Sequence, residues 1–598
     1  MSGGRPIRVW SGWACMLALG IAHAQAAAPA SETSRGSAEE SAATRVLVAA
    51  AERALPPALR SVLSDDAEIV WRDLPDDVHG RQFGRTIALQ RDLLPAVMAG
   101  HVEGADSPAL RALIHELAHR YDRLPQGGLS SDPRLRDLAG WPRRVWPWGG
   151  RDGENRFVDR SPDAYELHDP REFVAVNLEH FLLDPAYACR RPALFRYFVA
   201  HLQWTPTADD CATALPFVEA DEDATAALAQ IDPARVAGID YLLAEGNAQP
   251  MSRWGHSMLR LVICAPGRPR GPDCRLDLAH HRVLSFRAFV GDVQISSWRG
   301  LTGSYPSRLF LLPLEQIIDE YARTELRGLQ SIPLRLGHDE IAAVLAHAVQ
   351  MHWSYDGRYY FLGNNCAVET WRLLQVALPQ REPERWRSIT PTDLLKNLEQ
   401  AGIAEVSVLA DPEAARRLGY YFEPMSARYA AMFDVARRES ALPADSVEAW
   451  IALPPRQRRP WLAQDDLRTL AALLVLEEAA RRQQELRARD VLKRQLLSGK
   501  AGSRAAQAAV RQWLRDGGFL SRPAELVANG YGIPQDAERE RAQQEVLRRA
   551  ADLRHQDAAL KQAARDWLPP AHRQALDDID ANLATLGESL RRQVQDAR

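Results

Sequence analysis

The sequence predicts an α+β protein built from several modules, and three observations lead to that expectation. At 598 residues the chain is too long for one hydrophobic core. Short β-like runs lie among helical segments between about residues 231 and 400. From 401 to 598, Ala, Leu, Arg, Glu and Gln dominate and β-branched residues are scarce, which is typical of helices. We therefore expect modules over 46–230, 231–400 and 401–598.

The first 45 residues are expected to be a targeting segment and a linker. Two arginines precede an apolar stretch, and Ala22-His23-Ala24 offers the small residues of a cleavage site, with cleavage after Ala26 as the alternative. We expect a signal peptide over 1–24 and a flexible leader, rich in Ala, Ser, Glu and Thr, over 25–45. No later stretch is long and apolar enough to cross a bilayer, so we expect the mature protein in the periplasm.

Charge is nearly balanced along the chain. It carries 74 Lys and Arg against 78 Asp and Glu, a formal net charge of −4, which argues against a general nucleic-acid binder. The Arg-rich helices beyond residue 400 are expected to present solvated faces, and peripheral contact with an anionic membrane surface stays open.

Five cysteines remain after removal of the expected signal peptide. Cys264 and Cys274 flank a turn-rich loop, and Cys189 and Cys211 flank one apolar segment, so each pair is a candidate disulfide in an oxidising compartment. Cys366 is then left unpaired. A single thiol in an exported protein is either buried and inert or reactive.

The N-terminal module is expected to contain a β-like run at Thr86–Gln90, a helix over the following histidine motif, and a Gly-, Pro- and Trp-rich surface loop over 126–163. An acidic, Ala-rich stretch near 220–235 indicates a boundary. The middle module should alternate strands and helices. The β-like runs are Ile239–Leu243, Met258–Ile263, Val283–Phe289 and Tyr359–Leu362, and the helical segments are Leu314–Thr324, Asp339–His352 and Cys366–Val376.

The most informative motif is His115-Glu116-Leu117-Ala118-His119. Ser107-Pro108 is a helix start, and apolar residues recur after it at helical spacing. Two histidines four apart on a helix face the same way, so both imidazoles can reach one Zn²⁺ while Glu116 polarises a water.

A zinc hydrolase of this kind needs a third protein ligand, usually from a later helix. A helix starting at Asp169-Pro170 carries Glu172 near its beginning. Asp169 and Glu172 also fit a capping box, in which Glu172 would stabilise the helix start instead of binding a metal. Glu179, seven residues further on the same face, is the alternative ligand.

These residues resemble the gluzincin metallopeptidases with a short HExxHxxD motif and a later Glu-Phe-x-Ala-Val helix. The resemblance implies a zincin-like fold in this module. It implies His115, His119 and Glu172 as zinc ligands and Glu116 as the general base. It further implies Asp122 as a supporting carboxylate outside the ligand set and Tyr165 as a helper residue. The long insertion before Tyr165 departs from the family pattern.

A second motif lies in the middle module. Gly255-His256-Ser257 leads into a β-like run, and Asn364-Asn365-Cys366 leads into a helix. A cysteine in the first turn of a helix feels the positive end of the backbone dipole, which lowers its pKa. An imidazole brought beside it would accept the thiol proton and orient the thiolate for acyl transfer.

This stretch resembles the DUF4105 family, the N-terminal periplasmic domain of Lnb-type lipoprotein N-acyltransferases, which is similar to circularly permuted papain-like enzymes of the NlpC/P60 type. The matching residues are Gly255-His256-Ser257, Tyr360-Phe361 and Asn364-Asn365-Cys366. The resemblance implies His256 as base and Cys366 as nucleophile. Asn365 and the backbone N–H of Cys366 are candidate oxyanion donors, and Ser285 is our candidate for the orienting residue.

The sequence therefore favours a periplasmic envelope enzyme with a Cys/His site for acyl transfer or for amide or ester hydrolysis, plus a zinc-hydrolase-like module. Lipids, lipoproteins and peptidoglycan peptides all fit such a site as substrates. One alternative is a zinc metallopeptidase in which the papain-like part only binds substrate. The other is a catalytically inactive envelope scaffold.

Overall fold

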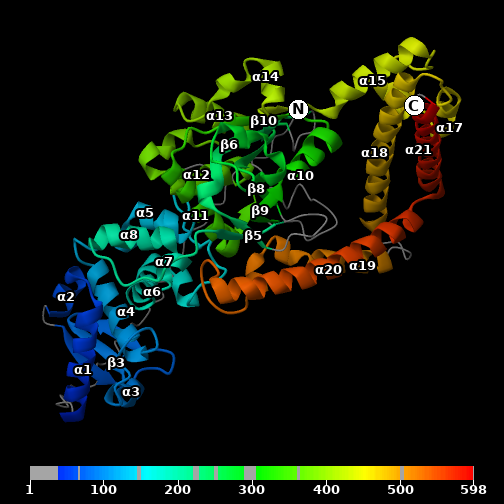
Figure 1. The fold of residues 1–598 in the computed structure, drawn as a ribbon. Helices are drawn as coiled ribbons and strands as arrows, with labels where there is room; N and C mark the ends of the chain where they lie inside the picture. Colours follow the sequence, from blue (N-terminus) through cyan, green and yellow to red (C-terminus); the bar gives the residue numbers. More distant parts are fainter. Residues whose placement is uncertain are drawn as a thin grey trace, which may run out of the picture.

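The computed structural model describes residues 38–64, 67–143, 150–219, 228–247, 253–288, 305–359, 364–497 and 504–596. Within these ranges the protein is a mixed α+β molecule, with an N-terminal module, a central sheet and long C-terminal helices (Figure 1). The expected signal peptide, residues 25–37 of the expected leader, and the motif residues Tyr360 and Phe361 lie outside the described residues.

The N-terminal module packs helices around a three-stranded sheet. β1 (Glu68–Arg72) runs parallel to β3 (Thr86–Gln90), and β2 (Gly80–Phe83) pairs antiparallel with β3 on its other side. The predicted run Thr86–Gln90 is thus a strand. The helices of this module are α1 (Ala38–Ala54), α2 (Pro57–Ser64), α3 (Leu94–Met98), α4 (Pro108–Asp122), α5 (Pro133–Ala139), α6 (Pro170–Leu183), α7 (Tyr187–Arg190) and α8 (Pro192–Leu202).

Two expectations for this region are wrong in part. The last eight residues of the expected leader belong to α1, because Ala43 and Leu47 recur at helical spacing and are buried in the module core. The expected loop over 126–163 contains α5. The Asp132 side chain accepts a hydrogen bond from the Arg134 N–H, and Gly140, with φ 99°, ends the helix.

The middle module is built on a seven-stranded sheet whose neighbouring strands are all antiparallel. Its order is β11-β9-β8-β7-β6-β10-β12, and a separate hairpin pairs β4 with β5. The strands are β4 (Leu215–Val218), β5 (Leu228–Ile231), β6 (Val236–Ala244), β7 (His256–Ile263), β8 (Arg282–Ala288), β9 (Tyr305–Pro313), β10 (Leu329–Pro333), β11 (Gly357–Tyr359) and β12 (Tyr421–Phe422).

The two faces of this sheet bury different helices. One face packs on α11 (His338–Ser354) and α12 (Cys366–Ala377), which supply Val344, Leu345, Trp371 and other residues to the largest core. The opposite face packs on α10 (Leu314–Ile318) and the π-helical turn Asp319–Thr324 through Ile317 and Tyr321. All three predicted helical segments are therefore helical, and the sheet extends beyond the expected boundary at residue 400 because β12 pairs with β10.

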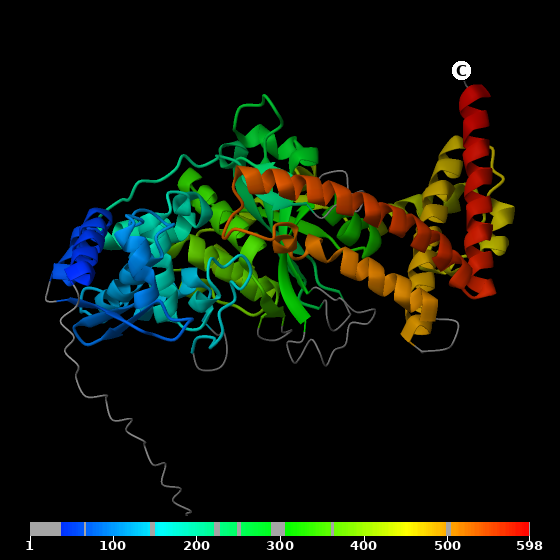
Figure 2. The same cartoon turned by 90° about the horizontal axis from the view of Figure 1, so that it is seen from below.

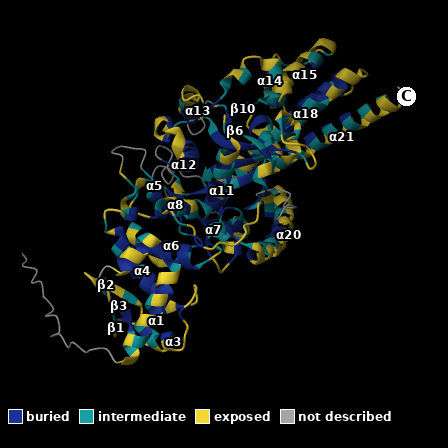
Figure 3. Cartoon of the chain, turned by 60° about the vertical axis from the view of Figure 1, so that its left-hand side comes forward, coloured by how far each residue is buried: buried dark blue, intermediate teal, exposed yellow. Residues whose placement is uncertain are grey.

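The C-terminal region is helical, as expected, apart from β12. Four of its helices, α15, α16, α18 and α21, share a core, and the two helices that follow α18 return along the middle module (Figures 1 and 2). Buried residues concentrate around the central sheet, whereas the C-terminal helices carry many exposed residues (Figure 3). The helices are α13 (Pro391–Gln400), α14 (Pro412–Arg417), α15 (Met425–Glu439), α16 (Val447–Ala452), α17 (Pro455–Arg458), α18 (Leu467–Leu497), α19 (Arg504–Asp516), α20 (Asp536–Trp567) and α21 (Pro570–Asp596).

Candidate metal centre and thiol site

The residues of the first motif come from two packed helices. α4 begins where the sequence predicts, because the Ser107 hydroxyl accepts a hydrogen bond from the Leu110 N–H at 3.3 Å and Pro108 takes the first helical position. α6 begins at Pro170, with the Asp169 carboxylate capping the N–H groups of Arg171 and Glu172. No capping box forms there, because the Glu172 carboxylate turns to the histidines.

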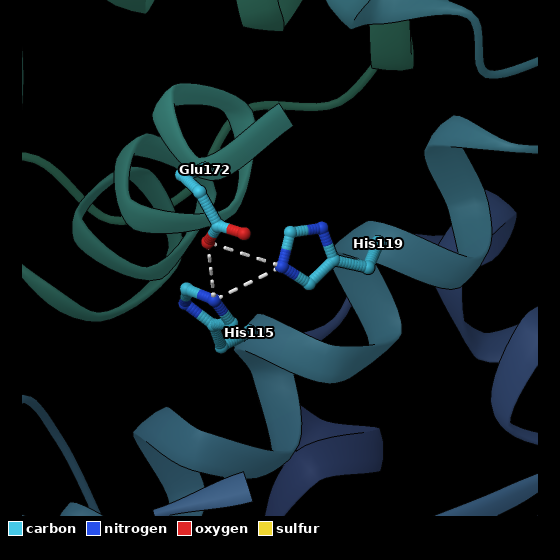
Figure 4. Close-up of side chains that lie close together, drawn as sticks. All are labelled: His115, His119 and Glu172. Carbon is cyan, nitrogen blue, oxygen red and sulfur yellow. Dashed lines mark hydrogen bonds and ion pairs between the residues drawn. The ribbon is translucent and has the colours of Figure 1, made fainter. Parts of the chain in front are cut away.

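The candidate ligand atoms form a compact triangle (Figure 4). The Nε2 atoms of His115 and His119 lie 3.1 Å apart, and each lies 3.3 Å from Oε2 of Glu172. Tetrahedral Zn²⁺ with bonds of about 2.0–2.1 Å places its ligand atoms about 3.3 Å apart. The three side chains therefore already have the spacing that zinc requires, and among the described residues they are the only such group.

Glu179 lies behind this triangle. Its Oε1 is 2.6 Å from Nδ1 of His115, and its Oε2 accepts a hydrogen bond from Nε of Arg111 at 3.1 Å. A carboxylate on the outer nitrogen fixes the tautomer and the ring orientation of a ligating histidine. Glu179 was the alternative ligand from the sequence, and the structure instead places it where it orients His115.

Carboxylate groups surround the two histidines of the candidate metal site. Burial opposes protonation of His115, but hydrogen bonds to Glu172 and Glu179 outweigh it and raise the pKa of His115 to about 10. Burial likewise opposes the charge of Glu172, but the two histidines lower the pKa of its carboxyl to about 2. Both shifts describe a place where positive charge is stabilised, and a divalent cation supplies such charge.

Glu116 lies beside the triangle and beneath strand β2. Its side chain is 7% exposed, and burial raises its pKa, partly offset by the neighbouring histidines and by the backbone N–H of Gln82. A Cβ built on Gly80 would lie 3.0 Å from Cγ of Glu116, so a larger residue there would press on the Glu116 side chain. A carboxyl with a raised pKa is suited to exchange protons with a substrate.

Two residues expected at this centre lie elsewhere. Asp122 accepts hydrogen bonds from the N–H and the hydroxyl of Ser130, at 2.8 and 2.5 Å, so it anchors the chain after α4 rather than the histidines. Tyr165 is 50% exposed, and its ring lies 5.0 Å from the ring of His168. Asp163 caps the turn Ala164–Leu167 by accepting from the Tyr165 N–H, and no hydrogen bond between Tyr165 and the candidate ligands occurs among the described residues.

The second motif places Cys366 at the first position of α12, as expected. The side-chain oxygen Oδ1 of Asn365 caps the helix by accepting from the N–H groups of Ala367 and Val368, and the side-chain nitrogen Nδ2 donates to Ile389 O at 2.8 Å. The Asn365 side chain thus caps α12 with its oxygen and ties it to Ile389 with its nitrogen, and its oxyanion role stays a prediction. Cys366 is 5% exposed, and burial raises the pKa of its thiol.

His256 and Cys366 are not brought together. The His256 ring stacks on Tyr321 with centroids 6.0 Å apart, and its Nε2 lies 3.2 Å from the Ser285 hydroxyl, on the sheet face that packs on α10. Among the described residues no hydrogen bond joins His256 to Cys366. Burial and the charges of Arg287 and Arg327 lower the pKa of His256 to about 3.

Ser257, the next residue along β7, faces α12 instead, because successive strand residues point to opposite faces. Its N–H and hydroxyl lie against the Cys366 sulfur and counteract the effect of burial on the thiol pKa. The hydroxyl is fully buried and makes no well-aligned hydrogen bond to any described residue. The sequence motif includes Ser257 but does not single it out. The alternation of side chains along a strand was the signal that could have identified Ser257 as the neighbour of Cys366.

Both expected disulfides are present, Cys189–Cys211 and Cys264–Cys274. Cys366 is the free cysteine among the described residues, and it is buried. Of the described helices, none has the length and apolar character needed to cross a bilayer.

Two segments of the chain match known families. Residues 222–401 match the family model of the Lnb N-terminal periplasmic domain, and residues 31–127 and 124–211 match a domain of unknown function, DUF7844. No curated protein and no solved structure matches the chain. The first match supports the Lnb-like assignment of the middle module, and together with the two disulfides it indicates a periplasmic protein of the cell envelope.

Proposed function

We propose that this protein is a zinc-dependent hydrolase of the periplasm that cleaves an amide bond in an envelope peptide. The observation that carries the proposal is the triangle of His115, His119 and Glu172, with edges of 3.1 to 3.3 Å and Glu116 beside it. When bound there, zinc supplies Lewis-acid activation of water and of a carbonyl oxygen.

The residues around the triangle have distinct tasks in this proposal. His115, His119 and Glu172 hold the metal, and Glu179 keeps the His115 ring in place through Nδ1. Glu116 accepts a proton from the attacking water and returns it to the leaving amine, and its raised pKa suits both steps.

Strand β2 supports a peptide as the substrate class. It is an edge of its sheet among the described residues, it contacts Glu116 through Gly80 and Gln82, and Phe83 at its end is 51% exposed. An exposed strand edge pairs with extended peptides through main-chain hydrogen bonds. A peptide on this edge would pass close to the proposed base, and the Lnb-like module would then serve as a substrate-binding part.

Metal analysis of the purified, mature protein tests the proposal. We expect about one zinc per chain, lost in His115→Ala and retained in Glu116→Gln, with His338→Ala, an exposed histidine, as the matched control. Peptidoglycan-peptide profiles of cells carrying Glu116→Gln should show accumulation of uncleaved substrate. A protein that takes up no zinc, or a Glu116→Gln strain with unchanged envelope peptides and lipids, contradicts the proposal.

A thiol acyl-transfer site at Cys366 is the second candidate. It is favoured by the free thiol at the start of α12 and by the Ser257 contact within the Lnb-like module. Its test is the rate at which iodoacetamide alkylates Cys366 in the native protein. A rate no faster than that of the denatured thiol rejects this candidate, and a faster rate that depends on Ser257 supports it.

A further inference from the structure

A groove runs between the N-terminal and middle modules, and its lining includes Glu369, one helical turn beyond Cys366 on α12. Its outer part lies between α5 and the segment 379–385 and leads to a narrow inner cavity, since both parts share Asp137 and Gln375. The outer groove has a volume of about 420 Å³ and the inner cavity about 30 Å³. A cavity needs at least about 10–15 Å³ to admit one water, so the inner part accommodates only a small end group.

Three buried polar atoms line the inner cavity without a hydrogen-bond partner among the described residues. They are Oε2 of Glu369, Nε of Arg372 and Nδ1 of His347, whose residues are 0%, 8% and 3% exposed. Buried polar groups are normally paired, and leaving them unpaired costs free energy. Three such atoms around one cavity are therefore an unusual concentration.

The remaining atoms of these side chains are firmly held. Oε1 of Glu369 accepts hydrogen bonds from Tyr355 and Asn364, at 2.5 and 2.7 Å. The terminal nitrogens of Arg372 donate to Oδ1 of Asn364 and to the Arg143 carbonyl, at 2.5 and 2.9 Å. The free acceptor on Glu369 and the free donor on Arg372 are thus fixed in place rather than mobile.

The charges around the cavity select the kind of group that fits. An anion would meet Glu369, and a cation would meet Arg372, whose Nη1 lies 3.8 Å from Oε2 of Glu369 and so forms an ion pair with it, too long for a hydrogen bond. Burial lowers the pKa of His347 to about 3, so this imidazole adds no charge. A neutral group that carries both a carbonyl oxygen and an N–H satisfies the acceptor and the donor together.

We propose that this groove is a binding site for a peptide amide, in which a carboxamide or main-chain amide enters the inner cavity and pairs with Glu369 and Arg372. The outer groove holds the rest of the peptide between the two modules, where ligand sites are common. The inference does not depend on the metal site, so each can fail without the other.

The test uses the full mature protein carrying Glu116→Gln, which prevents turnover, and N-acetyl-alaninamide as the probe. Calorimetric titration should show saturable binding of the amide. Binding of the methyl ester, which lacks the terminal N–H, should be weaker by about tenfold or more. Glu369→Gln should weaken amide binding to a similar extent, whereas Glu588→Gln, which alters an exposed carboxylate on α21, should leave it unchanged.

Val376→Met provides a second, independent variant. Val376 lines the apolar wall of the inner cavity, so the longer side chain should fill the cavity and abolish binding while the polar groups stay intact. Thermal unfolding establishes that each variant is folded. No saturable binding up to the solubility limit of the probe, equal binding of amide and ester, or unchanged binding in folded Glu369→Gln or Val376→Met protein would overturn the proposal.

Discussion

The two candidate sites show how differently a helix and a strand preserve a chemical motif. In the N-terminal module, His115 and His119 lie one turn apart on α4, and the structure brings them within 3.1 Å of each other. In the middle module, His256 and Ser257 are neighbours in sequence but lie on opposite faces of the sheet. A helical motif carries its geometry with it, whereas a strand motif depends on which face each residue takes.

The largest expected effect concerns the metal centre. His119→Asn should remove one corner of the ligand triangle and abolish zinc binding, because such a centre needs three protein ligands. Metal content after dialysis against a weak chelator measures this. The reciprocal variant Cys366→Ala should retain full zinc content, and zinc loss there would show that the two sites are coupled.

Removal of the orienting carboxylate should have a smaller effect. Glu179→Gln keeps the shape of the side chain but weakens its hold on Nδ1 of His115, so zinc affinity should fall about 10- to 100-fold. Competition with a fluorescent zinc chelator gives the affinity. If Glu172→Gln changes affinity less than Glu179→Gln does, the assignment of ligand and orienting residue is reversed.

The middle module should lose stability in acid through His352. Its Nε2 accepts the Val218 N–H at 2.9 Å and its Nδ1 donates to Leu309 O at 3.1 Å, and burial lowers its pKa to about 4. The unfolded chain, with a pKa of about 6.5, binds the proton first, so this stability is present above pH 6.5 and is lost between about pH 6.5 and 4.

At pH 5 the loss from His352 amounts to about 2 kcal/mol of unfolding free energy, from about 1.4 kcal/mol per pH unit. Urea unfolding at pH 7 and pH 5, followed by tryptophan fluorescence, measures it. In a folded His352→Gln variant this part of the pH dependence should vanish. A pH dependence identical to that of the wild type contradicts the assignment.

The smallest expected effect distinguishes the two neighbours on β7. Ser257→Ala should slow alkylation of Cys366 by about threefold near neutral pH, because the thiol loses a contact that lowers its pKa. His256→Ala should change the rate less, because its ring contacts Ser285 and Tyr321. A larger effect of His256→Ala would restore the Cys366/His256 pair as the working site.

Much of the metal centre could be predicted because its signals are local. The cap at Ser107, the cap at Asp169 and the spacing of the two histidines are short-range features, and α4 and α6 form where these predict. The roles of Asp122 and Tyr165 came from the family resemblance, and the structure shows Asp122 bonded to Ser130 and Tyr165 in a turn capped by Asp163.

By itself the sequence determined the starts of α4, α6 and α12, strands β3, β6, β7 and β8, and both disulfides, since each depends on residues close together or on simple periodicity. Only the tertiary structure decided that Glu172 meets Nε2 of His115 and Glu179 its Nδ1, and that Ser257 rather than His256 meets Cys366. Those outcomes depend on how separate elements pack, and packing is fixed by the whole core rather than by any one segment.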